Sequence, residues 1–207
     1  MLGLYVVVGV VHEVAALRFW GALRKATKAA LMVVLLVYYC VAANPVIVWA
    51  VVAIVFSCLG DVFLIRKDEP KFFRLGMVAF LLSHVFYSVT LVVLTERWSV
   101  VALGVSVAVA LVAEVLLPRI INPPKAMRAS IIVYGVVILA MSVLALQYVL
   151  AAPSVARVLV FLGSVVFIFS DTLMTYFAFG KKPKYFDAIT MLPYILAQGL
   201  IVYGLAA

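Results

Sequence analysis

Three side chains that can give and take protons interrupt long apolar stretches of this sequence. Asp61 ends the run FSCLGD, Asp171 ends the similar run FIFSD, and His84 ends FLLSH between them. A charged side chain facing lipid costs at least about 2.5 to 3.5 kcal/mol, so such groups normally face the interior of a helix bundle or a wet cavity. No neighbour in sequence neutralises any of the three. We therefore interpret them as functional residues that exchange protons, as acid–base catalysts and proton-coupled carriers both do.

A second group of charged residues has both a structural and a functional explanation. Glu13 and Glu114 are each followed five residues later by an arginine, and Lys28 and Arg128 each begin an apolar stretch. Ion pairs among these four residues could tie helix ends together. The same residues could instead bind a charged ligand, and the sequence leaves both explanations open.

Two neutral polar residues lie one helical turn from the proton-exchanging groups. Ser57 precedes Asp61 by four residues, and Tyr87 follows His84 by three, so each pair shares a helix face. Ser57 could satisfy an oxygen of Asp61, and Tyr87 could be a hydrogen-bond partner of His84. Either residue could also contact a ligand.

The elements that carry these residues belong to a membrane protein. Of the 207 residues, 69% are hydrophobic and 12% are charged, and the mean hydropathy is +1.31. Soluble domains are about half apolar and about one-quarter charged. The formal net charge is +8, but the basic residues fall at the ends of apolar stretches rather than on one surface. They therefore indicate membrane topology and not a nucleic-acid partner.

Eight apolar stretches are long enough to be transmembrane helices. A helix needs about 20 residues to cross a hydrocarbon core of about 30 Å. Lipid excludes unpaired backbone groups, so we expect helices rather than strands. The predicted fold class is an all-α integral membrane protein with one domain over residues 1–207. The predicted spans are 2–17, 28–43, 46–65, 73–94, 99–117, 129–150, 155–179 and 185–205.

The basic residues predict the orientation of these spans. Fourteen of the sixteen Lys and Arg residues lie in or beside the odd-numbered connections, whereas only Arg97 and Arg157 lie on the other side. The positive-inside rule then predicts a multi-pass protein of the cell (inner) membrane with both termini outside. At about 1.5 Å per helical residue, the buried ionisable groups all fall in the cytoplasmic half. We expect a polar chamber open to the cytoplasm and an apolar outer half.

The two halves of the chain, about 1–97 and 98–207, are predicted to form a tandem repeat of four plus four helices. In order, EVAALR resembles EVLLPR, KATKA resembles KAMRA, and FSCLGD resembles FIFSD. Because four is an even number, both repeats have the same orientation in the membrane and are related by an axis along its normal. Sites in such proteins tend to lie between the repeats. Asp61 and Asp171 hold matching positions in the two.

Four motifs, in this order, resemble those of a known family. They are SCLGD, ending at Asp61; GMVAFLLSHVFY, containing His84; FIFSD, ending at Asp171; and YILAQ, from Tyr194 to Gln198. Together they are similar to the YhhN-type membrane proteins, the lysoplasmalogenases, over nearly the whole chain and with the family's eight helices. The resemblance implies hydrolysis of the vinyl ether bond of lysoplasmalogens, giving a fatty aldehyde and glycerophosphocholine or glycerophosphoethanolamine.

The resemblance also implies roles for individual residues. Vinyl ether hydrolysis needs a protonated acid and a carboxylate that stabilises an oxocarbenium ion, so Asp61 and Asp171 are the predicted catalytic pair, with His84 assisting. The reaction needs no metal and no cofactor, and none is predicted. Lys28 or Arg128 is expected to receive the phosphate. The predicted substrate-binding residues are Lys28, Arg128, Glu13, Glu114, Ser57, Tyr87, Tyr194 and Gln198.

Transport is the competing prediction. A parallel repeat with intramembrane carboxylates and a histidine also suits a proton-coupled transporter of a small molecule or a lipid. A lipid-binding module without catalysis is a third alternative. The clustering of ionisable residues at one depth favours the enzyme, whose partners would be a lysophospholipid substrate and membrane lipid. The oligomeric state stays open.

Overall fold

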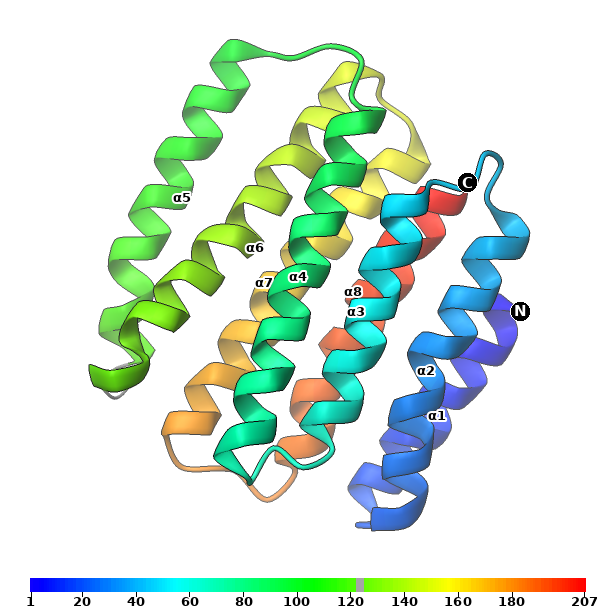
Figure 1. Cartoon of the computed structure of the whole chain (residues 1–207), viewed down its shortest axis with the longest axis vertical. Helices are drawn as coiled ribbons and strands as arrows, with labels where there is room; N and C mark the ends of the chain where they lie inside the picture. Colours follow the sequence, from blue (N-terminus) through cyan, green and yellow to red (C-terminus); the bar gives the residue numbers. More distant parts are fainter. Residues whose placement is uncertain (122–124) are drawn as a thin grey trace.

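A computed structural model describes residues 1–121 and 125–207, except for the side chains of residues 110, 113, 114, 116–121 and 126. The described residues form eight α-helices and no strand (Figure 1). The helices are α1 (Leu2–Leu17), α2 (Gly21–Ala42), α3 (Val48–Leu64), α4 (Pro70–Leu94), α5 (Val100–Ile121), α6 (Lys125–Ala151), α7 (Val155–Phe179) and α8 (Phe186–Ala206).

Each predicted span corresponds to one of these helices, so the prediction of an all-helical chain is confirmed. The largest difference is at α2, which begins at Gly21 rather than at residue 28. Its first two turns are rich in Ala, Arg and Lys, which favour helix, so the helix continues beyond the apolar stretch. Apolar length alone therefore underestimates a helix that extends into the polar boundary.

Five helices in the described part of the chain are long and apolar enough to cross a membrane: α2, α4, α6, α7 and α8. They are the features that mark a multi-pass membrane protein. Helices α1 and α3 are also apolar but shorter, with 16 and 17 residues. The eight-span topology, the outward termini and the tandem repeat stay predictions.

The helices pack as a bundle in which α3 lies closely against α4, and α7 against α8. Glycine permits both approaches, because a Cβ atom on Gly60 would lie 2.7 Å from the Phe80 ring, and one on Gly163 would lie 2.9 Å from the Ala197 carbonyl oxygen. Helices α1 and α2 lie at one side of the bundle and α5 at the other (Figure 1). The α1–α2, α3–α4 and α7–α8 connections meet at one end, which we name the mouth end.

Neutral polar side chains lie in the half of the bundle away from the mouth end. Thr90 and Thr95 near the end of α4, and Ser142 and Gln147 on α6, are all buried. The two threonine hydroxyls donate hydrogen bonds to carbonyl groups four residues earlier in the chain. The half away from the mouth end is therefore not purely apolar, and that it is the outer half stays a prediction.

Candidate functional site

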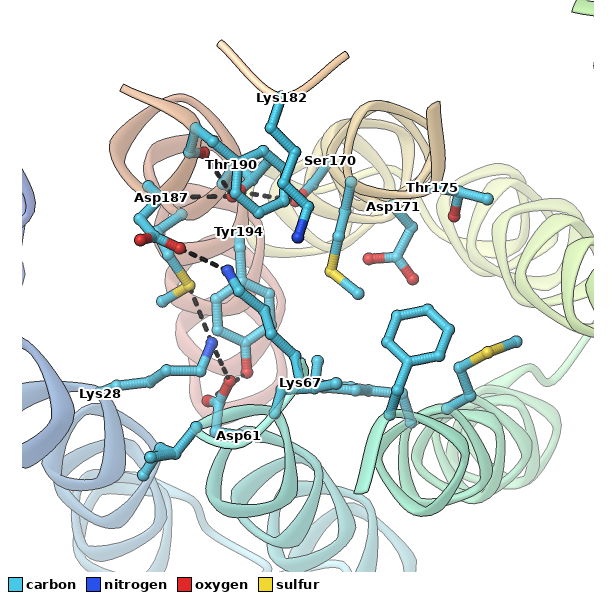
Figure 2. Close-up of a pocket in the computed structure, with 18 of the residues that line it drawn as sticks. Lys28, Asp61, Lys67, Ser170, Asp171, Thr175, Lys182, Asp187, Thr190 and Tyr194 are labelled. Atoms are coloured by element: carbon cyan, nitrogen blue, oxygen red, sulfur yellow. Dashed lines mark hydrogen bonds and ion pairs between the residues drawn. The ribbon is translucent and has the colours of Figure 1, made fainter. Parts of the chain in front are cut away.

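A cavity of about 330 Å³ opens at the mouth end, and both predicted catalytic aspartates line it. Asp61 lies in the last turn of α3, and Asp171 lies on α7 about two turns before its end. Figure 2 shows the two residues on different walls of the cavity. The fold thus brings together two carboxyl groups that are 110 residues apart in the sequence.

Asp61 is fully buried and paired with a cation. Its side chain is 1% exposed, and the Nζ atom of Lys28 lies 3.1 Å from its Oδ1. The Tyr194 hydroxyl donates a hydrogen bond to its Oδ2 at 2.7 Å. Burying a carboxylate is costly unless it is both paired and hydrogen-bonded, and Asp61 is both. Asp61 is therefore held in place by side chains of α2 and α8, one of which is a cation.

Asp171 has a neutral partner instead. The Tyr134 hydroxyl on α6 donates a hydrogen bond to Oδ2 of Asp171. None of the ion pairs formed by the described residues includes Asp171. The sequence does not single out Tyr134, because this tyrosine stands in an apolar stretch outside every recognised motif. Only the packing of α6 against α7 reveals it.

His84 lies behind the cavity and not in its wall. It is buried, and its Nδ1–H donates a hydrogen bond to the Phe80 carbonyl oxygen at 2.6 Å, whereas its Nε2 has no partner among the described residues. Its ring meets those of Phe167 and Tyr134 edge-on, with centroids 4.6 Å and 5.7 Å apart. His84 can therefore influence Asp171 through the packing of Tyr134, without touching a ligand in the cavity.

Three aromatic rings close the deep end of the cavity, and we name them the aromatic floor: Phe80, Phe167 and Tyr194. Their centroids lie 5.6 to 6.4 Å apart, and each pair meets edge-to-face, a favourable geometry. Phe80 and Tyr194 line the cavity, whereas Phe167 is completely buried. The missing side chain of Gly60 leaves room for the Phe80 ring beside Asp61.

Comparison with known proteins identifies the family. A sequence model of the YhhN family matches residues 23–205, which include both aspartates and the aromatic floor. The chain belongs to the YhhN family. The resemblance that the motifs indicated is thereby confirmed, and this family is associated with hydrolase activity. No curated protein and no solved structure matches the chain.

In this YhhN family member, three predicted binding residues form a network behind the floor. Tyr87 donates a hydrogen bond to Oε1 of Gln198 at 3.0 Å, and Nε2 of Gln198 donates to Oγ of Ser57 at 3.0 Å. Ser57 also shares a hydrogen bond of 2.6 Å with Ser83. All four residues are buried and none lines the cavity. These hydrogen bonds join α3, α4 and α8 to one another. Ser57 thus bonds to α4 and α8, and Tyr87 to α8, and neither bonds to the side chain one turn away on its own helix, Asp61 or His84.

The other predicted binding residues are dispersed. Glu13 of this YhhN protein faces an apolar groove between α1 and α8, and its Oε1 has no hydrogen-bond partner among the described residues. Arg128 is exposed at the start of α6 and does not line the cavity. The side chain of Glu114 lies outside the described residues. Lys28 is one of the four residues that could have tied helix ends together by ion pairs. It pairs with Asp61, which is not one of the four.

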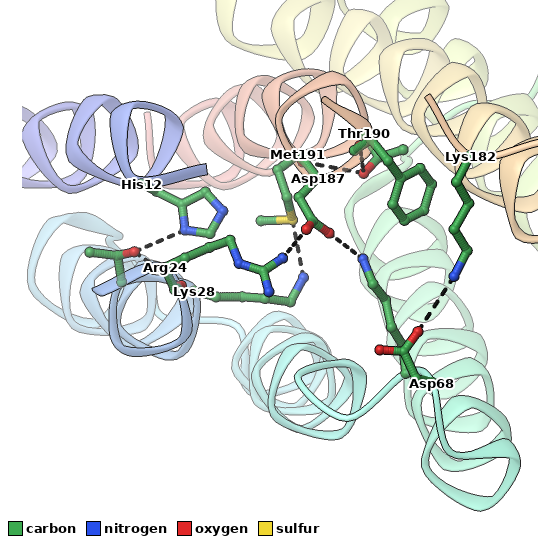
Figure 3. A network of polar contacts seen from close by, with 11 residues as sticks. His12, Arg24, Lys28, Asp68, Lys182, Asp187, Thr190 and Met191 are labelled. Atoms are coloured by element: carbon green, nitrogen blue, oxygen red, sulfur yellow. Dashed lines mark hydrogen bonds and ion pairs between the residues drawn. The ribbon is translucent and has the colours of Figure 1, made fainter. Parts of the chain in front are cut away.

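A cluster of charged residues surrounds the mouth of the cavity (Figure 3). Asp187, in the first turn of α8, forms ion pairs with Arg24 of α2 and with Lys67 of the α3–α4 connection. Lys182 pairs with Asp68, with 3.4 Å between Nζ and Oδ1. Burial lowers the pKa of the Lys67 ammonium, and the hydrogen bond to Asp187 opposes this shift. In the sequence the basic residues of this cluster indicate only topology, because they come from separate segments.

The walls of the cavity differ in polarity. Apart from Asp61 of α3, the charged residues belong to α2, α8 and the connections at the mouth, whereas α4, α6 and α7 contribute a largely apolar wall around Asp171. A pocket that combines an apolar surface with a few converging polar groups is typical of a small-molecule site. This one suits an amphiphile with a charged head and an apolar chain. The apolar residues of that wall are Phe73, Met77, Ile131, Met174 and Phe179.

Proposed function

We propose that this protein is a lysoplasmalogenase-type ether hydrolase, which cleaves the vinyl ether bond of lysoplasmalogens. The products are a fatty aldehyde and glycerophosphocholine or glycerophosphoethanolamine. The observation that carries the proposal is that two aspartates with different partners line one cavity, in a member of a family associated with hydrolase activity.

The reaction begins when an acid transfers a proton to the β-carbon of the vinyl ether, which produces an oxocarbenium ion. Water adds to the carbon that carries the ether oxygen and loses a proton. The resulting hemiacetal breaks its bond to the glycerol oxygen, giving the aldehyde and a glycerol hydroxyl. Glycosidases meet a similar cation with two carboxyl groups, one of which is an acid and the other an anion. Asp61 and Asp171 offer such a pair.

The partners of the two aspartates support different roles for them. Asp61 is paired with Lys28, so we assign to it the anion that stabilises the oxocarbenium ion and orients the attacking water. A negative charge in a largely apolar wall needs a cation, and none pairs with Asp171 among the described residues. We therefore assign the transferred proton to Asp171.

The uneven walls of the cavity suit a lysophospholipid. The apolar wall of α4, α6 and α7 would hold the alkenyl chain, and the charged mouth would hold the head group. The vinyl ether then lies between these two regions, at the level of the aspartates. With the predicted orientation, the mouth opens to the cytoplasmic side of the cell (inner) membrane, and membrane lipid surrounds the bundle.

An assay of the purified protein tests the proposal. Choline and ethanolamine lysoplasmalogens are supplied in detergent micelles, the saturated ether analogue serves as the control, and released aldehyde is measured. We expect aldehyde from the vinyl ethers and none from the saturated ether. Folded protein that releases no aldehyde from either vinyl ether would contradict the proposal.

Proton-coupled transport is less well supported. A carrier needs a route that opens to each side in turn, whereas this cavity ends at the aromatic floor, in which Phe167 is completely buried. Counterflow of a lipid or small molecule in reconstituted vesicles, without aldehyde release, is the result that would favour transport.

A further inference from the structure

We propose that the mouth of the cavity binds the head group of a lysolipid: Arg24 and Lys67 bind its phosphate, and His12 accepts a hydrogen bond from its free glycerol hydroxyl. The inference rests on the proposed function, because it takes the same cavity as the place where the lipid binds. It assigns roles to three residues that the sequence motifs do not include.

Lys28 and Arg128, the two cations that the sequence predicted at the phosphate, do not lie where they could bind it. The Nζ atom of Lys28 lies 3.1 Å from Asp61 and 3.0 Å from the Met191 sulfur, and its side chain is only 15% exposed, so it lies below the mouth, beside the aspartate. Arg128 is exposed and does not line the cavity. A phosphate at the opening therefore needs other cations.

Arg24 and Lys67 meet this need. Their side chains are 27% and 24% exposed, so they face the opening while being largely removed from water. Asp187 contacts both and holds them on the same side of the mouth (Figure 3). The Lys67 ammonium also lies 4.3 Å from the centroid of the Phe186 ring, a cation–π contact that orients it further. A guanidinium and an ammonium held in this way can bind oxygens of one phosphate.

The balance of charge around the cavity also favours an anion. Five basic side chains and four carboxyl groups line it. With the transferred proton on Asp171, the cations exceed the anions by two. A phosphate diester brings one negative charge to this positive opening and reduces the excess of cations from two to one.

His12 supplies the second, independent observation. It lines the cavity, it is 1% exposed, and its Nε2 is buried without a hydrogen-bond partner in the described part of the chain. The Thr27 hydroxyl donates its proton to the Leu23 carbonyl oxygen at 2.8 Å, so it accepts the hydrogen bond of 2.9 Å from Nδ1–H of His12. Nε2 is then an acceptor that needs a donor, because buried polar atoms are nearly always satisfied.

The donor that fits Nε2 of His12 is a hydroxyl group. Figure 3 shows His12 beside Arg24 and Lys28, two cations that repel an ammonium donor. A lysolipid carries one free hydroxyl on the glycerol carbon next to the phosphate-bearing carbon, whereas a diacyl lipid carries an ester there. His12 would therefore select lysolipids over lipids with two chains.

Binding of uncleavable ligands tests the inference. The ligands are the saturated ether lysophosphocholine, its methyl ether in which the free hydroxyl is blocked, an alkylglycerol without phosphate, and inorganic phosphate. The variants are Arg24→Met, Lys67→Met and His12→Phe. Lys71→Met and Arg74→Met remove exposed basic residues of α4 at the same end of the bundle and serve as matched controls.

We expect Arg24→Met and Lys67→Met each to weaken binding of the ether lysolipid by about 10- to 100-fold, while binding of the alkylglycerol and both controls stay unchanged. The wild-type protein should prefer the free hydroxyl over its methyl ether, a preference that His12→Phe abolishes. The comparison of ligands on wild-type protein keeps the role of His12 testable even if that variant does not fold.

Three results would overturn the inference. The alkylglycerol could bind wild-type protein as tightly as the ether lysolipid, the methyl ether could bind as tightly as the free hydroxyl, or inorganic phosphate could bind more tightly than the lipid. None of these measurements needs turnover. A protein that hydrolyses vinyl ethers without a phosphate preference would refute only this inference, whereas a phosphate-selective protein without hydrolysis would refute only the proposed reaction.

Discussion

Asp61 and Asp171 end similar sequence motifs and line the same cavity, yet their surroundings differ. Asp61 is completely buried between a lysine and a tyrosine, whereas Asp171 is partly exposed and has a tyrosine as its hydrogen-bond partner. The residue type and the motif are shared, so they cannot set the role of either carboxyl group. In the reaction that we propose, the nearby cation sets these roles, because it favours the anion at Asp61 and leaves Asp171 to deliver the proton.

Removing the proposed proton donor tests this difference most strongly. Asp171→Asn should lower kcat for aldehyde release by about 10²- to 10⁴-fold, the usual contribution of general acid catalysis. The free energy of unfolding should change little, because no ion pair is lost. Glu69→Gln, which alters a half-exposed carboxylate at the mouth end, is the control. Full activity of folded Asp171→Asn would refute the assignment.

Removing the cation that pairs with Asp61 should have an effect of similar size in free energy, but on stability rather than on kcat. Lys28→Met leaves a buried carboxylate without a partner, which should lower the free energy of unfolding by about 3 to 5 kcal/mol. Adding Asp61→Asn to this variant should recover part of the loss, since the buried charge is then gone. Denaturant unfolding in mild detergent measures both. If Lys28→Met unfolds like the wild-type protein, the ion pair is not what distinguishes Asp61.

Substitution of Tyr134 and Tyr194 should change kcat less, but it compares the surroundings of the two aspartates directly. Tyr134→Phe removes the hydrogen-bond donor of Asp171 and should lower kcat by about 10-fold, whereas Tyr194→Phe leaves Asp61 held by Lys28 and should lower it by about 3-fold. Steady-state kinetics on one substrate compare the two variants directly. A larger loss in Tyr194→Phe would reverse the ranking of the two environments.

The smallest effect on turnover is expected behind the aromatic floor. Ser83→Ala removes one hydrogen bond to Ser57, which still has its bond from Gln198. It should lower the free energy of unfolding by about 1 kcal/mol and leave kcat within about 2-fold of wild type. Thermal unfolding and the aldehyde assay measure the two quantities. A large loss of kcat at normal stability would mean that this network reaches the substrate.

The sequence could predict the helices and the interior position of the two aspartates for one physical reason. Lipid tolerates neither unpaired backbone groups nor unpaired charge, so hydropathy marks the spans, and each ionisable residue within them must face inward or toward water. The partners could not be predicted. Helices that are apolar on all sides carry no periodic signal for the face that meets a neighbour, so nothing marked Tyr134 as the partner of Asp171.

Arg24 and Lys67 at the mouth of the cavity were missed for a different reason. Basic residues in the connections of multi-pass proteins already serve the positive-inside rule, so Arg24 and Lys67 carry no separate functional signal in the sequence. The predicted depth of a residue in the membrane also does not show which cavity its side chain faces. Glu13 has about the same predicted depth as Asp61, but it points to a groove between α1 and α8, because position along a helix does not fix direction around its axis.

If the protein catalyses the proposed reaction in a cell membrane, the aromatic floor has a consequence for the energy supply of the cell. Carboxyl groups reachable from both faces of a membrane would let protons leak down the electrochemical gradient that drives ATP synthesis. Phe80, Phe167 and Tyr194 lie at the deep end of the cavity, so in the reaction that we propose both aspartates exchange protons with one side of the membrane only. A proton given to a substrate would then be returned from the side that receives the products, and repeated turnover would carry no proton across the membrane.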